Sequence, residues 1–295
     1  MDRSKTKGYL YALGAALALS ASFVFSKSAL NHLNMVQFGL IWFGIGVIWN
    51  LLSYFFTGAY RTFRESMPAK LYVAILIAVL EAAATGLFYI AIKKMENPAV
   101  VSFIGNAGPV FVTIMGITLL RERFSFWQMG GILITIAGIF VINYNGTFFG
   151  GFADHGSVYV LSASFLFALA TIAGRRYSSL LDPGLMSLIR SFILSLAFLA
   201  IYLSGSQDLR FSLQVWRDLT IGSMLETLLT IVFAYQALRF IEATRTSLII
   251  STKGVWTLVL AWVFLGVFPL PHQLAGGLLT LAGVWLITGL KASRH

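Results

Sequence analysis

Four ionisable side chains stand within long apolar stretches of the sequence: Glu81, Glu226, Arg190 and Lys253. Placing such a group at bilayer depth costs about 2.5–3.5 kcal/mol on insertion scales, so each of the four is a candidate functional residue. Lys253 lies beside Gly254, and an ammonium that faces a cavity would attract a carboxylate or a phosphate. A buried carboxyl can take up and release a proton, so either glutamate could carry one.

The same four side chains also have a structural interpretation. Two carboxylates and two cations balance in charge, so salt bridges between them could hold helices together. Lys253 could equally have a glutamate or a ligand as its partner, and the sequence leaves both alternatives open. In either case the four side chains should face the interior of a helix bundle, because lipid offers them no partner.

A glycine-rich segment with a proline interrupts one apolar stretch. Residues 105–109 read Gly-Asn-Ala-Gly-Pro, and Pro109 removes a backbone donor and predicts a kink. The carbonyl freed near Gly105 and the amide of Asn106 could bind a ligand, with Gly105, Gly108, Pro109 and Gly254 as hinge positions. The alternative is a packing kink, in which small residues let two helices approach closely.

The composition is that of a membrane protein rather than of a soluble enzyme. Of the 295 residues 58% are hydrophobic and 11% charged, and the mean hydropathy is +0.83. Soluble domains average about 45–50% apolar and about 25% charged residues. The sequence has no cysteine, four histidines, and no H-E-x-x-H, G-x-S-x-G or P-loop pattern. We therefore expect no enzyme activity, no metal site and no cofactor.

Apolar stretches of membrane-spanning length account for most of the chain. A spanning helix needs about 20 mostly apolar residues. By this criterion the sequence predicts ten spans, at about 8–29, 36–57, 70–92, 98–119, 126–144, 154–176, 184–204, 217–239, 243–266 and 272–290. The remaining residues form short loops, which leaves no room for a soluble domain.

The basic residues predict the orientation. With the N-terminus in the cytoplasm, 14 of the 21 Lys and Arg residues fall in cytoplasmic segments and five in outer segments. The net charge of +10 therefore indicates topology and not nucleic-acid binding. We expect a multi-pass protein of the cell membrane (the inner membrane in a Gram-negative host) with both termini cytoplasmic.

The two halves of the chain, 1–149 and 150–295, resemble each other. A shift of 145 residues overlays 128–142 on 273–287 with 7 identities in 15, and it overlays Glu81 and Thr85 on Glu226 and Thr230. Each half holds five spans, and because five is odd the second half enters the membrane from the opposite side. The sequence therefore predicts an all-α, ten-helix membrane protein with a 5+5 inverted-topology repeat. Such folds place the substrate site between the halves, near the bilayer midplane.

Three short patterns within this ten-helix plan are distinctive. They are Ile241-Glu242-Ala243-Thr244-Arg245 with Trp256-Thr257 and Leu265-Gly266; Arg121-Glu122-Arg123 with Gln128, Gly131 and Ala137-Gly138; and Asp182-Pro183 with Arg190. With the repeat, they make the chain similar to the drug/metabolite transporter superfamily, in its EamA-type branch of ten-helix bacterial transporters. Members of that family export amino acids and other metabolites, and related branches carry nucleotide sugars or sugar phosphates.

The resemblance adds aromatic residues to the candidate site. Trp42, Tyr89, Tyr235 and Trp256 lie on helices that line the cavity in the family, and they could stack on a flat or apolar substrate. Gln236 adds an amide at similar depth. Core packing is the alternative role for each of these aromatic rings.

The prediction is a secondary transporter that exports a small metabolite, such as an amino acid, by alternating access. A carrier of the same fold for a nucleotide sugar, sugar phosphate or quaternary amine is the first alternative, and a non-transporting membrane scaffold is the second. The expected partners are a small-molecule solute and membrane lipids, with proton coupling as an option and no nucleic acid. The oligomeric state would be a monomer or a homodimer.

Overall fold

The computed structural model describes residues 3–56, 71–120, 126–142, 144, 155–177, 183–205, 209–241, 246 and 249–289. The regular secondary structure of these residues is helical, without a strand. Seven helical stretches within them are long and apolar enough to cross a membrane, and Met129–Ile142 and Ile249–Leu265 are shorter apolar helices. The protein is therefore an all-α, polytopic membrane protein.

The described helices fall into two sets of five spans when a broken helix is counted once. The first set is α1 (Arg3–Leu30), α2 (Met35–Phe56), α4 (Leu71–Lys94), α5 (Pro98–Ile104) followed by α6 (Ala107–Leu120), and α7 (Phe126–Ile142). The second set is α8 (His155–Tyr177), α9 (Pro183–Leu203), α10 (Leu213–Ser223) with η1 (Met224–Thr230) and α11 (Ile231–Phe240), α13 (Lys253–Leu265), and α14 (Pro271–Gly289). The predicted spans agree with these bounds to within about five residues, except that the ninth was predicted at 243–266 and α13 begins at Lys253. Three spans are broken in their interior.

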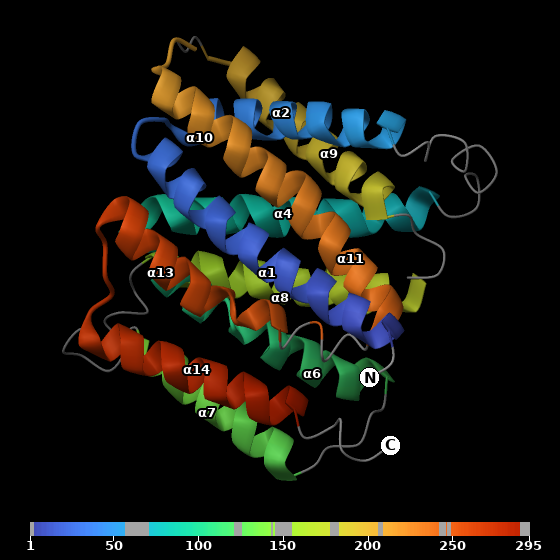
Figure 1. The fold of residues 1–295 in the computed structure, drawn as a ribbon, viewed down its shortest axis with the longest axis vertical. Coiled ribbons are helices and arrows are strands. Elements are labelled where there is room, and N and C mark those ends of the chain that lie inside the picture. Colours follow the sequence, from blue (N-terminus) through green and yellow to red (C-terminus); the bar gives the residue numbers. More distant parts are fainter. Residues whose placement is uncertain are drawn as a thin grey trace.

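The packing of the helices shows the inverted repeat (Figure 1). α7 and α14, the fifth span of each half, pack along each other at one end of the bundle, and α2 and α9, the second spans, pack together at the other. Between them α4 packs on α8 and α1 packs on α11. These two contacts are equivalent, because the repeat exchanges the third span with the eighth and the first with the sixth. The two halves thus interleave, and neither forms a bundle of its own.

Each interior break has a local cause. The first lies at Gly105 and Asn106, one helical turn before Pro109. In a continuous helix the ring of Pro109 would clash with the backbone carbonyl of Gly105. The second is the π-helix η1, which lies in the middle of the eighth span. The third is a turn at Thr252, so Lys253 begins α13 instead of lying deep within a continuous helix.

α7 and α14 form a close-packed pair outside the centre of the bundle. A Cβ added to Gly138 would lie 2.7 Å from the carbonyl oxygen of Gly276, and one added to Gly276 would lie 2.6 Å from that of Gly138. Thr135 and Thr280 are fully buried at this contact. The small residues let the two backbones touch, as is usual where helices associate within lipid.

Several predicted features lie outside the described residues. They include the loops 58–69 and 145–153, Arg121-Glu122-Arg123, Asp182, Glu242 and Arg245. Eight of the 14 basic residues that the prediction places in the cytoplasm also belong to this group.

Candidate functional site

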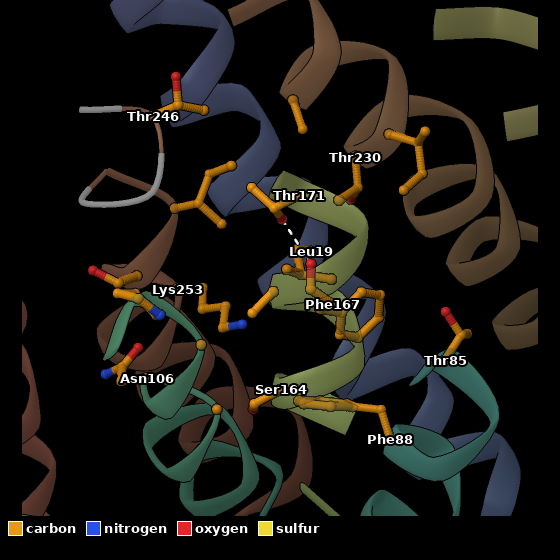
Figure 2. Close-up of a pocket in the computed structure, with 18 of the residues that line it drawn as sticks. Leu19, Thr85, Phe88, Asn106, Ser164, Phe167, Thr171, Thr230, Thr246 and Lys253 are labelled. Carbon is orange, nitrogen blue, oxygen red and sulfur yellow. Dashed lines mark hydrogen bonds between the residues drawn. The ribbon is translucent and has the colours of Figure 1, made fainter. Parts of the chain in front are cut away.

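A cavity of about 260 Å³ lies at the centre of the bundle, between the two halves. It is lined by α1, α4, the junction of α5 and α6, and α8, together with Arg190 of α9, η1, α11 and the first residue of α13 (Figure 2). The described residues of α2, α7 and α14 contribute no lining side chain. The pair formed by α7 and α14 therefore supports the bundle from outside the cavity.

Lys253 supplies a positive charge to the cavity. The break before α13 puts it at the first turn of the helix, and its side chain extends into the space between α8 and the α5–α6 junction (Figure 2). The ammonium lies 5.8 Å from the ring centroid of Phe23 and 5.7 Å from that of Phe88, which is cation–π distance. Among the described side chains no carboxylate forms a salt bridge with it. A glutamate partner, one of the two that the sequence allowed, is thus not observed among the described residues.

Arg190 and Glu226 form a salt bridge in the cavity lining. Both are buried, with 1% and 5% of their surface exposed. Trp42 of α2 donates its indole N–H to the other carboxylate oxygen of Glu226 at 3.4 Å. An isolated buried charge is far more costly than a buried pair, so this contact holds η1 against α9 and α2. The predicted structural pairing is thus observed for Arg190 and Glu226.

Glu81 has different surroundings, although the repeat places it at the position equivalent to Glu226. One carboxylate oxygen accepts a hydrogen bond from the Tyr235 hydroxyl at 3.0 Å, and the other has no hydrogen-bond partner among the described residues. The side chain is buried, with 8% of its surface exposed, and it does not line the cavity. The structure thus gives the two glutamates unequal partners.

The π-helix η1 brings polar groups of the eighth span toward the cavity. Its Thr230 donates to the carbonyl oxygen of Leu225, five residues earlier, at 2.8 Å. The carbonyl oxygen of Thr227 accepts from Asn50 of α2 at 3.2 Å and from Ser187 of α9. π-helical turns occur often at functional sites and leave carbonyls that neighbouring helices can bind. No pattern in the sequence signals this turn, although the polar residues around it are visible there.

The break in the fourth span places Asn106 in the cavity lining. Its side-chain NH₂ donates to the hydroxyl of Thr280 on α14 at 3.1 Å, and its buried side-chain oxygen has no hydrogen-bond partner within the described ranges. The carbonyl of Gly105, expected to be free, accepts from the backbone N–H of Gly108 at 3.0 Å. Gly105, Gly108 and Pro109 all line the cavity. Asn106 is therefore the residue of this segment that can bind a polar ligand.

The remaining lining combines apolar surface with a few polar atoms. Leu19, Phe23, Phe88 and Phe167 supply apolar and aromatic surface. The lining also holds buried polar atoms that have no hydrogen-bond partner among the residues that the structure describes, on Thr85, Tyr89, Asn106, Arg190 and Thr246. An apolar pocket with a few convergent polar groups is typical of small-molecule sites. With Lys253, this lining can hold a solute that has an anionic group and an apolar body.

Several predicted site residues lie away from the cavity. Trp42 and Tyr235 sit behind the lining, where they bind Glu226 and Glu81, and the half-buried Gln236 is also outside it. Trp256 is 39% exposed and lies outside it as well. Of the four predicted aromatic residues, only Tyr89 lines the cavity.

Gly254, the remaining predicted hinge residue, lies at a close helix contact. A Cβ at this position would come within 2.5 Å of the Phe103 ring on α5. The glycine therefore lets α13 pack directly on α5. Among the described residues no group of three or more His, Cys, Asp or Glu could hold a metal ion.

Comparison with known proteins identifies relatives over most of the chain. The model of the EamA-like transporter family matches residues 6–144 and 155–289. An uncharacterized transporter of Synechocystis is 27% identical over 72% of this chain, one of Archaeoglobus fulgidus 26% over 63%, and one of Bacillus subtilis 23% over 68%. The matches span 64%, 65% and 66% of those relatives' lengths.

A solved structure described as "Crystal structure of protein" has the same fold. It superposes with a TM-score of 0.71 over 98% of this chain and 99% of its own, at 13% identity.

Proposed function

Because the chain belongs to the EamA-like transporter family, we propose that it is a secondary transporter that exports a small metabolite, such as an amino acid, across the cell membrane. The observation that carries this proposal is Lys253. Its ammonium extends into a central cavity between the two repeats and has no carboxylate partner among the described side chains. A carboxylate of the solute would supply the missing counterion.

The cavity lining fits a small solute that is anionic at one end and apolar elsewhere. The carboxylate would lie at Lys253, and an aliphatic or aromatic side chain would pack on Phe88 and Phe167. The unpartnered side-chain oxygens of Thr85 and Asn106 could accept hydrogen bonds from an amino group. The volume, about 260 Å³, lies just below the roughly 300–1,000 Å³ of sites that hold drug-sized ligands, which favours a small metabolite.

The other solute classes suit this lining less well. A nucleotide sugar or sugar phosphate would profit from a second free cation, but Arg190 is paired with Glu226. A quaternary amine would enter a cavity that already holds the positive charge of Lys253 and would be repelled by it.

Two features of the structure support the proposal of alternating access. The lining reaches Leu238 and Thr246, toward the end of the bundle at which α1 begins. At the opposite end, two lysines connect α1 with α4. Lys27 of α1 donates to the carbonyl oxygens of Ile92 and Met95, at 3.2 and 2.6 Å. Lys93 of α4 donates to the carbonyl oxygens of Leu30 and Leu33. We assign this conformation to the inward-facing state, with the N-terminus cytoplasmic. If each repeat adopted the conformation that the other now has, the cavity would close at the cytoplasmic end and open at the opposite end.

Flux measurements in proteoliposomes test the proposed function. The panel should contain amino acids, sugar phosphates, nucleotide sugars and quaternary amines, each with empty liposomes as the control. We expect saturable flux of one or more amino acids or related carboxylates. Absence of flux for every solute would support a scaffold, and flux of only cationic solutes would refute the anion site.

Reporter fusions test the membrane topology. The inverted repeat predicts that reporters in loops 58–69 and 145–153 lie on opposite sides of the membrane, the first in the cytoplasm. Fusions to both termini should report the cytoplasm. The same side for both loops would refute the arrangement on which alternating access depends.

A further inference from the structure

The two repeat-related glutamates differ in access to a cation. Arg190 of α9 forms its salt bridge with Glu226. α2 is the counterpart of α9 in the first half, and its residues Met35–Phe56 contain no Lys or Arg. The described bundle core thus provides a paired arginine for Glu226 and no equivalent residue for Glu81.

The atoms around Glu81 suit a neutral carboxyl better than an anion. Tyr235 donates one hydrogen bond to it, and its second oxygen is buried without a donor in the part of the chain that the structure describes. An ionised carboxylate has about four lone-pair sites to satisfy, and burying a charge with so few partners is costly. The ionisable groups around it are Arg190 of α9, Glu226 of η1 and Tyr235 of α11, and Tyr177 of α8 packs in the adjacent apolar cluster.

We propose that Glu81 is a proton-binding site in the membrane core and that its occupancy regulates transport. The proton adds to the carboxylate of Glu81 and leaves a neutral carboxyl, and its release restores the anion. The binding step depends only on the fold, whereas its effect on flux rests on the proposed function.

The structure connects this site to the cavity along two routes. Tyr235 belongs to α11, whose Ile231, Ala234 and Leu238 line the cavity. Arg190 interacts electrostatically with both carboxylates, and its Nε has no hydrogen-bond partner among the described groups. Loss of the proton from Glu81 creates a second anion that competes with Glu226 for Arg190, so the salt bridge in the cavity lining weakens.

Infrared difference spectroscopy of the purified full-length protein, without solute, tests the binding step. A pH titration should show the C=O stretch of a protonated carboxyl that disappears as the pH rises. Glu81→Gln should abolish this band. Asp218→Asn is the matched control and should leave it unchanged, because Asp218 is a buried carboxylate with partners in Ser28 and Arg217. A band that persists in Glu81→Gln would overturn the proposal.

A second variant covers the case in which Glu81→Gln does not fold. Tyr235→Phe keeps the ring and removes the one hydrogen bond to Glu81, so the pH midpoint of the band should shift. An unchanged midpoint would show that the band belongs to another carboxyl and would overturn the assignment.

Flux measurements test the coupling. Proteoliposome flux of the parent protein should change with pH, whereas flux of Glu81→Gln should be independent of pH. The same pH response in both proteins would overturn the regulatory role. A Glu81 band without any solute flux would refute the transport function and support the proton site. Solute flux without the band would support the transport function and refute the proton site.

Discussion

Replacing Lys253 by glutamine removes the charge to which we assign solute binding. The ammonium faces the rings of Phe23 and Phe88 and has no carboxylate partner among the described side chains. A hydrogen bond to a charged group contributes about 1.5–3 kcal/mol. Since about 1.4 kcal/mol corresponds to a factor of ten, we expect Lys253→Gln to weaken solute binding about 10- to 100-fold.

The assay combines binding and stability. Apparent KM is measured by counterflow in proteoliposomes, and Tm is measured on the same preparation in detergent. Lys253→Arg keeps the charge and should retain much more of the affinity than the glutamine variant. Tm should not fall in Lys253→Gln, because the substitution removes a half-buried charge that has no counterion among the described side chains.

Two results would refute this reasoning. An unchanged KM for carboxylate solutes would remove Lys253 from the solute site. A lowered Tm that is restored, together with transport, by the double change Lys253→Gln with Glu226→Gln would show that the two side chains form a structural pair, contrary to the salt bridge of Glu226 with Arg190. Restored Tm with transport still lost would leave the solute role of Lys253 in place.

Two further predictions concern the framework around the cavity. Arg190→Gln should lower the free energy of unfolding by about 3–5 kcal/mol, because it leaves the buried Glu226 without its cation. Thermal unfolding in detergent would measure this loss, and an unchanged Tm would contradict the salt bridge. Gly254→Ala should cost about 1–3 kcal/mol, since the new Cβ would meet Phe103 at 2.5 Å. Gly86→Ala is its matched control: no atom lies within 4 Å of the added Cβ, so Tm should stay or rise, and equal losses in both variants would refute the steric explanation.

The positions of the membrane spans could be predicted from the sequence. α2 was expected at 36–57 and is Met35–Phe56, and α9 was expected at 184–204 and is Pro183–Leu203. In lipid a backbone must satisfy its hydrogen bonds within its own helix, so length and apolar composition are sufficient to locate a span. The inverted repeat follows in the same way from the odd number of spans in each half.

The interior position of the charged residues was also visible in the sequence. Glu81, Glu226 and Arg190 are all buried, because the cost of exposing them to lipid exceeds any other preference of the helices that carry them. The break near Pro109 was predicted from the missing backbone donor.

The tertiary structure alone decided which of these groups meet. Arg190 binds Glu226 rather than Glu81, Tyr89 lines the cavity, and Trp256 lies outside it. These helices are largely apolar and carry only a few polar residues each, so their sequences do not fix the rotation of each helix about its axis. That rotation is set by contacts between spans, such as the close approach of Gly254 to Phe103, and with it the choice of side chains that face the solute.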